Sequence, residues 1–127
     1  MSCFFVLHAV NLSALAHNGV AMSPTSRSLQ RLRDLGYHAQ VVERWNAFSK
    51  RRHDLFGGDI LALKPGEPVL VVQATTASHH TARRTKLATS GFVTLWNSAG
   101  ATLEIWSWAK QGLRGKRKIW TVRREAL

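Results

Sequence analysis

The chain has 127 residues, of which 18 are Lys or Arg and 7 are Asp or Glu, so its formal net charge at pH 7 is +11. This length suits one domain, and a content of 45% hydrophobic residues with five Trp excludes a disordered basic tail. So large an excess of positive charge favours a polyanion as the partner, with nucleic acid first and an anionic membrane surface second.

The first 21 residues differ in composition from the rest of the chain, because Arg27 is the first Lys, Arg, Asp or Glu in the sequence. Their apolar run, 3–16, is shorter than the roughly 20 residues that a membrane-spanning helix needs, and no basic segment precedes it as in a secretory signal. We therefore interpret 1–21 as an artefact of start-site assignment ahead of one domain, 22–127, that begins at Met22. If the segment is translated, we expect a loosely docked helix or strand.

The domain opens with a helical pattern. The segment 23–36 predicts an amphipathic helix, because a Ser-Pro pair opens it, leucines recur at helical spacing and a glycine closes it. The run 37–45 is rich in β-branched and aromatic residues and predicts a strand. Residues 46–58 are polar and end in two glycines, which predicts a loop and a turn.

Short strands dominate the remainder, with one more helix predicted over 78–91 and closed by Gly91. The strand patterns 59–63 and 69–75 are continuous apolar runs, as expected of strands that are buried on both faces. The strand patterns 92–96 and 102–108 predict a hairpin. A basic loop, 112–118, precedes the last predicted strand, 119–123. The order of elements predicts an α/β fold with a mixed central sheet flanked by helices. The predicted strands are 59–63, 69–75, 92–96, 102–108 and 119–123.

The short turn between the first two of these strands fixes which residues lie opposite each other. If Leu63 pairs with Val69 across it, Asp59 lies opposite Gln73. Cross-strand partners have Cβ atoms about 5 Å apart, so both side chains could reach one metal ion or one water. Thr75 shares the face of Gln73, while the alternating apolar residues face the other way, toward a helix.

These patterns resemble the PD-(D/E)XK nuclease superfamily. The strings DLFGGDILAL and VLVVQATT, followed by a helix with Arg83 and Lys86, are most similar to its small Holliday-junction-resolvase-like and phage-type members. The resemblance covers about residues 23–108 and implies the α-β-β-β-α-β restriction-endonuclease-like core of that superfamily. It also implies a cytoplasmic protein of a bacterial or phage-infected cell.

The resemblance implies a metal-dependent DNA endonuclease that uses Mg²⁺ or Mn²⁺ and could select its DNA by structure. Asp59 matches the metal-binding aspartate of the superfamily, Gln73 stands where a second acid is normal, and Thr75 stands where lysine is expected. An uncharged Gln oxygen is a weaker ligand than a carboxylate. Thr75 cannot supply the positive charge that lysine would place near the phosphate.

Nearby residues could replace both missing groups. Lys86 or Arg83, from the helix directly after the strand, could serve as the cation, and Glu43 or Asp54 could supply the missing carboxylate. The candidate catalytic residues are Asp59, Gln73, Thr75 and Lys86, and the candidate metal ligands are Asp59, Gln73, Asp54 and Glu43.

Basic residues gather in three clusters, two of which flank the proposed site in the sequence. Such clusters track DNA phosphates without reading base sequence, and their binding weakens steeply with salt. We expect DNA contacts from Lys50, Arg51 and Arg52; from Arg83, Arg84 and Lys86; and from Arg114, Lys116, Arg117 and Lys118.

The five Trp residues fall on predicted strands, where a core position or a dimer surface is commoner than base stacking. Trp106 and Trp108 share one face of a strand, whereas Leu103 and Ile105 share the other. One of these faces could pair with a second subunit. Resolvase-like members are commonly dimers, so the resemblance also makes a homodimer an option.

Other chemistries find little support. The sequence contains no nucleophile-elbow, P-loop or dinucleotide-binding pattern, and Cys3 alone excludes a disulfide or a cysteine zinc site. His79 and His80 are adjacent, so they do not form the spacing that binds zinc on a helix, and we expect both to be solvated or to face phosphate.

Because the motif lysine is absent, the alternative is a catalytically degenerate protein that binds DNA without cutting it. A basic structural protein without a DNA partner is a third class, which heparin chromatography would distinguish.

Overall fold

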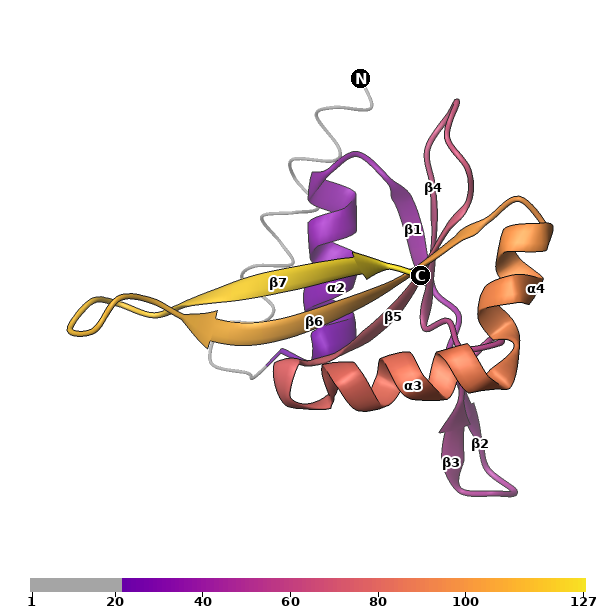
Figure 1. The fold of residues 1–127 in the computed structure, drawn as a ribbon, viewed down its shortest axis with the longest axis horizontal. Coiled ribbons are helices and arrows are strands. Elements are labelled where there is room, and N and C mark those ends of the chain that lie inside the picture. Colours follow the sequence, from indigo (N-terminus) through magenta and orange to yellow (C-terminus); the bar gives the residue numbers. More distant parts are fainter. Residues whose placement is uncertain (1–21) are drawn as a thin grey trace.

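A five-stranded mixed sheet forms the centre of the computed structural model, which describes residues 22–127 (Figure 1). The predicted extension 1–21 lies outside the described residues. The strand order is β1-β4-β5-β6-β7, with β5 and β6 parallel and the other neighbours antiparallel. The strands are β1 (His38–Val41), β4 (Ile60–Leu63), β5 (Leu70–Thr76), β6 (Thr102–Gln111) and β7 (Ile119–Ala126).

Helices cover both faces of this sheet, as the sequence predicted for an α/β fold. Helix α2 (Pro24–Asp34) packs on one face, and α3 (His80–Ser90) with α4 (Phe92–Ser98) packs on the other. A 3₁₀ turn, η1 (Ala77–His79), joins β5 to α3. No helix within the described part of the chain is long and apolar enough to cross a membrane.

Helix α2 begins where the sequence predicted. The Ser23 hydroxyl oxygen accepts a hydrogen bond from the Ser26 N–H at 3.1 Å, and Pro24 occupies the first helical position. Leu32 is completely buried against the sheet, whereas Leu35 is exposed beyond the last turn. The apolar face of α2 is therefore shorter than the leucine spacing indicated.

Each face of β6 is covered by the chain itself. Trp106 and Trp108 pack with Leu32 on the α2 side, and Leu103 and Ile105 pack on the side of α3 and α4. The predicted separation of these pairs onto opposite faces is confirmed. The expectation that one pair faces a second subunit is wrong, because all four side chains are buried within the chain.

The predicted register between β4 and β5 is also confirmed. Ile60 lies opposite Val72, and Ala62 lies opposite Leu70, in an antiparallel ladder. One step beyond, the Asp59 N–H donates to the Val72 carbonyl at 2.8 Å. This pairing places Asp59 beside Gln73 on the α3 face, as the length of the turn predicted.

Residues 92–96 form helix α4, where the sequence predicted a strand. Gly91, at φ +82°, ends α3 and directly precedes α4, so the chain turns from one helix into the next without a strand. Phe92, Val93 and Trp96 lie on one helical face and pack against the sheet. As a result β6 has no partner in 92–96, and it pairs in parallel with β5.

The predicted strand 37–45 is split, and the predicted loop 46–58 contains a strand. The chain leaves the sheet after β1 and forms a separate two-stranded hairpin of β2 (Arg44–Asn46) and β3 (Arg51–His53), which projects from the body (Figure 1). All six of these strand residues are exposed. The predicted strand is therefore confirmed in the sheet for 38–41, whereas 44–45 belong to the separate hairpin.

Gly57 allows the loop before β4 to pass close to α3. Its φ is +85°, and a Cβ there would lie 2.5 Å from Leu87 Cδ2. We expect Gly57→Ala to lower the free energy of unfolding by about 2–3 kcal/mol, measured by urea denaturation. Gly66→Ala is the matched control, because Gly66 has φ +81° with nothing within 4 Å. It should cost about 1 kcal/mol, and equal losses in both variants would contradict a role for the close approach.

Candidate active site

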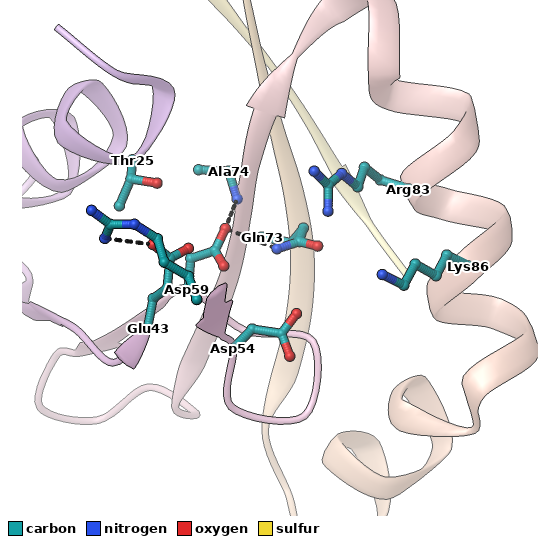
Figure 2. A pocket seen from close by; sticks show the side chains of 9 residues that line it. Thr25, Glu43, Asp54, Asp59, Gln73, Ala74, Arg83 and Lys86 are labelled. Carbon is teal, nitrogen blue, oxygen red and sulfur yellow. Dashed lines mark hydrogen bonds and ion pairs between the residues drawn. The ribbon is translucent and has the colours of Figure 1, made fainter. Parts of the chain in front are cut away.

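A pocket of about 260 Å³ lies beside the paired residues of β4 and β5 (Figure 2). Its wall is almost wholly polar and draws on the sheet, on the β2–β3 hairpin and on both flanking helices. The lining residues are Thr25, Glu43, Arg52, Asp54, Asp59, Gln73, Ala74, Arg83 and Lys86.

Asp59 and Gln73 form the floor of this pocket. The Gln73 Nε2 donates to Asp59 Oδ2 at 2.8 Å, and the Ala74 N–H donates to the same oxygen at 2.9 Å. Only 4% of Asp59 and 3% of Gln73 is exposed. Both donors converge on Oδ2, and Figure 2 shows the Gln73 side-chain oxygen turned away from Asp59. Asp59 Oδ1 and Gln73 Oε1 are thus the oxygens that this pair can offer to a ligand.

The environment of Asp59 favours its protonated form. Burial is the main cause that raises the pKa of its carboxyl group to about 6, and the negative charges of Glu43 and Asp54 contribute smaller increases to that value. The hydrogen bonds from Ala74 and Gln73 act in the opposite direction and are outweighed. Two further carboxylates at this pocket thus repel a negative charge on Asp59, and a bound cation would relieve that repulsion.

Glu43 and Asp54 reach the pocket from the two ends of the hairpin. The Val42 N–H donates to the Asp59 carbonyl at 2.8 Å, which holds the start of the hairpin beside the site. Glu43 accepts a hydrogen bond from Arg52 Nη1 at 3.0 Å, and Asp54 Oδ1 accepts one from the Gly57 N–H at 3.2 Å. Both carboxylates proposed as replacements therefore line the same pocket as Asp59.

Arg83 and Lys86 supply the positive wall. They lie three residues apart on α3, so they project from the same side of the helix, and both line the pocket. No ion pair within residues 22–127 involves either of them. Arg84 has turned away to pair with Glu125 at 3.2 Å. The predicted cluster is therefore divided, with two cations at the pocket and the third paired with a carboxylate of β7.

Thr75 is the candidate catalytic residue that does not line the pocket. It is buried on β5 and lies opposite Ser107 of β6 in the parallel register. The expected lysine position thus lies beneath the start of α3, next to a buried polar network. The cations at the pocket, Arg83 and Lys86, come instead from the first two turns of α3.

That network is built on His80, for which the prediction of a solvated or phosphate-facing side chain is wrong. His80 is buried, with Nδ1 at 2.6 Å from the Ser107 hydroxyl and Nε2 at 2.6 Å from the Glu125 carboxylate. The hydrogen bond from His80 is the main cause that lowers the pKa of Glu125. Ser107 is only 1% exposed, so no substrate reaches its hydroxyl. The three residues therefore join α3, β6 and β7 and do not form a hydrolytic triad.

We expect His80→Phe to lower the free energy of unfolding by roughly 2–4 kcal/mol, because the partners of the imidazole would remain buried without hydrogen bonds. Urea denaturation measures this loss. Thr81→Ala, at the exposed next position of α3, is the control and should change the free energy little. Unchanged stability of His80→Phe would show that the network does not hold α3 to the sheet.

The other predicted DNA contacts lie outside the pocket. Lys50 and Arg51 are exposed on the β2–β3 hairpin, whose third basic residue, Arg52, reaches into the pocket. The cluster of Arg114, Lys116, Arg117 and Lys118 occupies the exposed loop of the long β6–β7 hairpin, which extends far from the body (Figure 1).

The oxygen donors of the pocket suit a hard cation such as Mg²⁺ or Mn²⁺. No three carboxylate, His or Cys side chains in the described range 22–127 lie close enough together to hold a metal among themselves. Asp59 and Gln73, with Asp54 or Glu43, offer carboxylate and amide oxygens of the kind that these ions prefer. Mg²⁺ retains several waters and often takes only one or two protein carboxylates plus a substrate phosphate, so these residues fit the ion.

Sequence reasoning missed how the loop between Asp54 and Asp59 is held. Trp96 Nε1 donates to the Phe56 carbonyl at 2.9 Å, and the Phe56 ring contacts the rings of Phe92 and Trp96 edge-on. Phe56 has φ +50°, a conformation that a bulky residue adopts only when its surroundings impose it. Recognising α4 as a helix would have provided the signal, because only α4 brings both aromatic rings to this loop.

Comparisons with protein-family models, with curated proteins and with solved structures found no match to this chain.

Proposed function

We propose that this protein is a metal-dependent DNA endonuclease that hydrolyses phosphodiester bonds, with the α-β-β-β-α-β core of the PD-(D/E)XK superfamily. The main support is the Asp59–Gln73 hydrogen bond across β4 and β5, in a pocket that Arg83 and Lys86 line from the helix after β5. A buried acid, a neighbouring oxygen ligand and unpaired cations are the groups that phosphodiester hydrolysis requires.

Each residue has a distinct task in this proposal. Asp59 and Gln73 would hold Mg²⁺ or Mn²⁺, with Asp54 or Glu43 as a further ligand. Such an ion, when bound, lowers the pKa of a water and polarises the phosphate. Lys86 and Arg83 bind the non-bridging phosphate oxygens and stabilise the negative charge that grows as water adds to phosphorus. The bond to one ester oxygen then breaks, which leaves a phosphate monoester and a hydroxyl group.

Basic residues outside the pocket would hold the DNA. The β2–β3 hairpin carries Lys50 and Arg51 beside the site, and the β6–β7 loop carries a second group of exposed cations at a distance (Figure 1). With a net charge of +11, contacts to several phosphates would make binding strongly dependent on salt. These contacts position the DNA and carry little sequence information.

The alternative is a degenerate nuclease that binds DNA without cutting it. Two observations favour it. Thr75 occupies the expected lysine position beneath α3, and no three metal-binding side chains converge within residues 22–127. In that case the pocket would bind a phosphate through Arg83 and Lys86 and perform no chemistry.

Cleavage of labelled linear duplex, single-stranded and four-way-junction DNA tests the proposal directly. Reactions contain Mg²⁺, Mn²⁺ or EDTA, with the protein starting at Met22. We expect cleavage of at least one substrate with either metal and none with EDTA. Salt-sensitive binding of all substrates without cleavage would overturn the proposal in favour of the degenerate alternative.

A further inference from the structure

The β2–β3 hairpin exposes two aromatic side chains that contribute nothing to the core. Trp45 is 60% exposed, and Phe48, in the turn between the strands, is 100% exposed. Two large rings held in water within four residues of each other are unfavourable for folding alone. Their position on a projecting hairpin beside the pocket points to a ligand that covers them.

The register of the hairpin places Trp45 on the side of the pocket. Trp45 lies directly opposite Arg52, and directly opposed residues of an antiparallel pair share one face. Arg52 bonds to Glu43 at 3.0 Å and lines the pocket. A base that stacks on the Trp45 ring would therefore belong to the same DNA strand region whose phosphate enters the pocket.

The turn that carries Phe48 is ordered by its own hydrogen bonds. Asn46 Oδ1 accepts from the Phe48 N–H at 2.8 Å and from the Ser49 N–H at 3.1 Å. The Ser49 hydroxyl lies 2.9 Å from His53 Nε2, which ties the turn to β3. The exposed ring is thus presented on a preorganised loop, which lowers the entropic cost of binding.

The charge of the hairpin indicates the class of ligand. Arg52 lies opposite Trp45 on the same face, Lys50 is exposed in the turn that carries Phe48, and Arg44 and Arg51 are exposed on the other face of the hairpin. Aromatic rings interleaved with cations are the combination that binds single-stranded nucleic acid, because bases stack on the rings and the cations follow the backbone. A fully paired duplex keeps its bases stacked within the helix and offers these rings little to cover.

We propose that the β2–β3 hairpin binds unpaired DNA bases by stacking on Trp45 and Phe48. The inference rests on the proposed nuclease function and deepens it, because it defines the substrate as DNA with a single-stranded segment beside the phosphate that enters the pocket. The hairpin then selects this DNA, and the pocket residues Asp59 and Lys86 act on it.

Binding in EDTA separates this proposal from catalysis. Fluorescence anisotropy measures the affinity of the wild-type protein, Trp45→Ala and Phe48→Ala for a labelled single strand and for a fully paired duplex of the same sequence. We expect each substitution to weaken single-strand binding by about 10-fold and duplex binding by less than about 3-fold. Leu113→Ala is the matched control, because Leu113 is an apolar residue that is 77% exposed on the other basic loop.

Two further measurements distinguish the loss of a stacking ring from a loss of folding. Trp45→Phe retains a stacking ring and should restore most single-strand affinity, and thermal unfolding should be unchanged in all variants because the hairpin is exposed. Equal losses for both DNA forms, or no loss for either, would overturn the hairpin proposal. If the hairpin variants lose single-strand affinity as expected while the wild-type protein cuts no DNA with Mg²⁺ or Mn²⁺, the nuclease proposal alone fails.

Discussion

Asp59→Asn is expected to reduce metal-dependent DNA cleavage by about 1000-fold or more, since it removes the buried carboxylate that would hold the cation. Asn keeps an oxygen that can accept the bonds from Gln73 and Ala74, so the fold should survive. DNA affinity in EDTA should change by less than about 3-fold, because the basic surfaces are untouched. Cleavage and anisotropy assays on one protein preparation measure both effects. Cleavage that persists in Asp59→Asn would exclude Asp59 as the principal ligand.

The same substitution should raise stability at neutral pH. Burial raises the pKa of Asp59 from 3.8 to about 6, so the folded state binds this proton more tightly than the unfolded state does. The resulting penalty is absent below about pH 4 and complete above about pH 7, where it amounts to about 2–3 kcal/mol. Urea denaturation should therefore show Asp59→Asn more stable than the wild-type protein at pH 7.5 and similar to it at pH 4.

A proton and a cation compete for the Asp59 carboxylate. The affinity for the metal should therefore rise with pH, whereas the stability of the metal-free protein falls. Below pH 6 the apparent affinity for Mn²⁺ should rise about tenfold for each pH unit, and it should level off above about pH 7. The increase in melting temperature caused by Mn²⁺ reports this affinity without any need for cleavage. Asp59→Asn should show no such increase, and an equal increase in both proteins would place the metal elsewhere.

Lys86→Met is expected to lower the cleavage rate by about 100-fold, because a preorganised cation beside the reacting phosphate is removed. Methionine retains the length of the side chain, and Lys86 is exposed, so stability should remain within about 0.5 kcal/mol of the wild-type value. Single-turnover cleavage at saturating protein isolates the chemical step from binding.

Lys64→Met is the control for this loss of charge. Lys64 lies on the turn between β4 and β5, where it pairs with Glu67 at 3.8 Å, outside the residues that line the pocket. The Lys64→Met substitution removes a single positive charge, as Lys86→Met does, and should leave the single-turnover cleavage rate unchanged. Similar rates for the two variants would show that Lys86 contributes only to the general positive field.

The central part of the site could be predicted from the sequence because strand pairing obeys simple geometry. A short turn sets the register of 60–63 against 70–75, whereas the apolar residues on both faces of these strands would not fix it alone. Asp59 and Gln73 therefore had to be neighbours once both segments were read as strands. Arg83 and Lys86 followed, because a helix directly after a strand packs back over it.

The errors arose where local patterns are ambiguous or where distant residues decide. A five-residue apolar run such as 92–96 fits a buried strand or one face of a short helix equally well, and the left-handed conformation of Gly91 between α3 and α4 decided the matter. For His80, the deciding partners lie 27 and 45 residues further along the chain. Trp45 was assigned to the sheet because β-propensity does not distinguish a core strand from a free hairpin.

The two halves of the pocket belong to parts of the fold with different local stability. Asp59 is fastened on both sides by backbone hydrogen bonds to Val42 and Val72, and it directly precedes β4, a strand in the interior of the sheet, where local opening costs most free energy. Glu43, Arg52 and Asp54 belong to an exposed hairpin, whose few contacts with the body can break while the sheet stays intact. The molecule can thus widen the mouth of the pocket for a thick ligand while the acid and amide at its floor keep their relative positions.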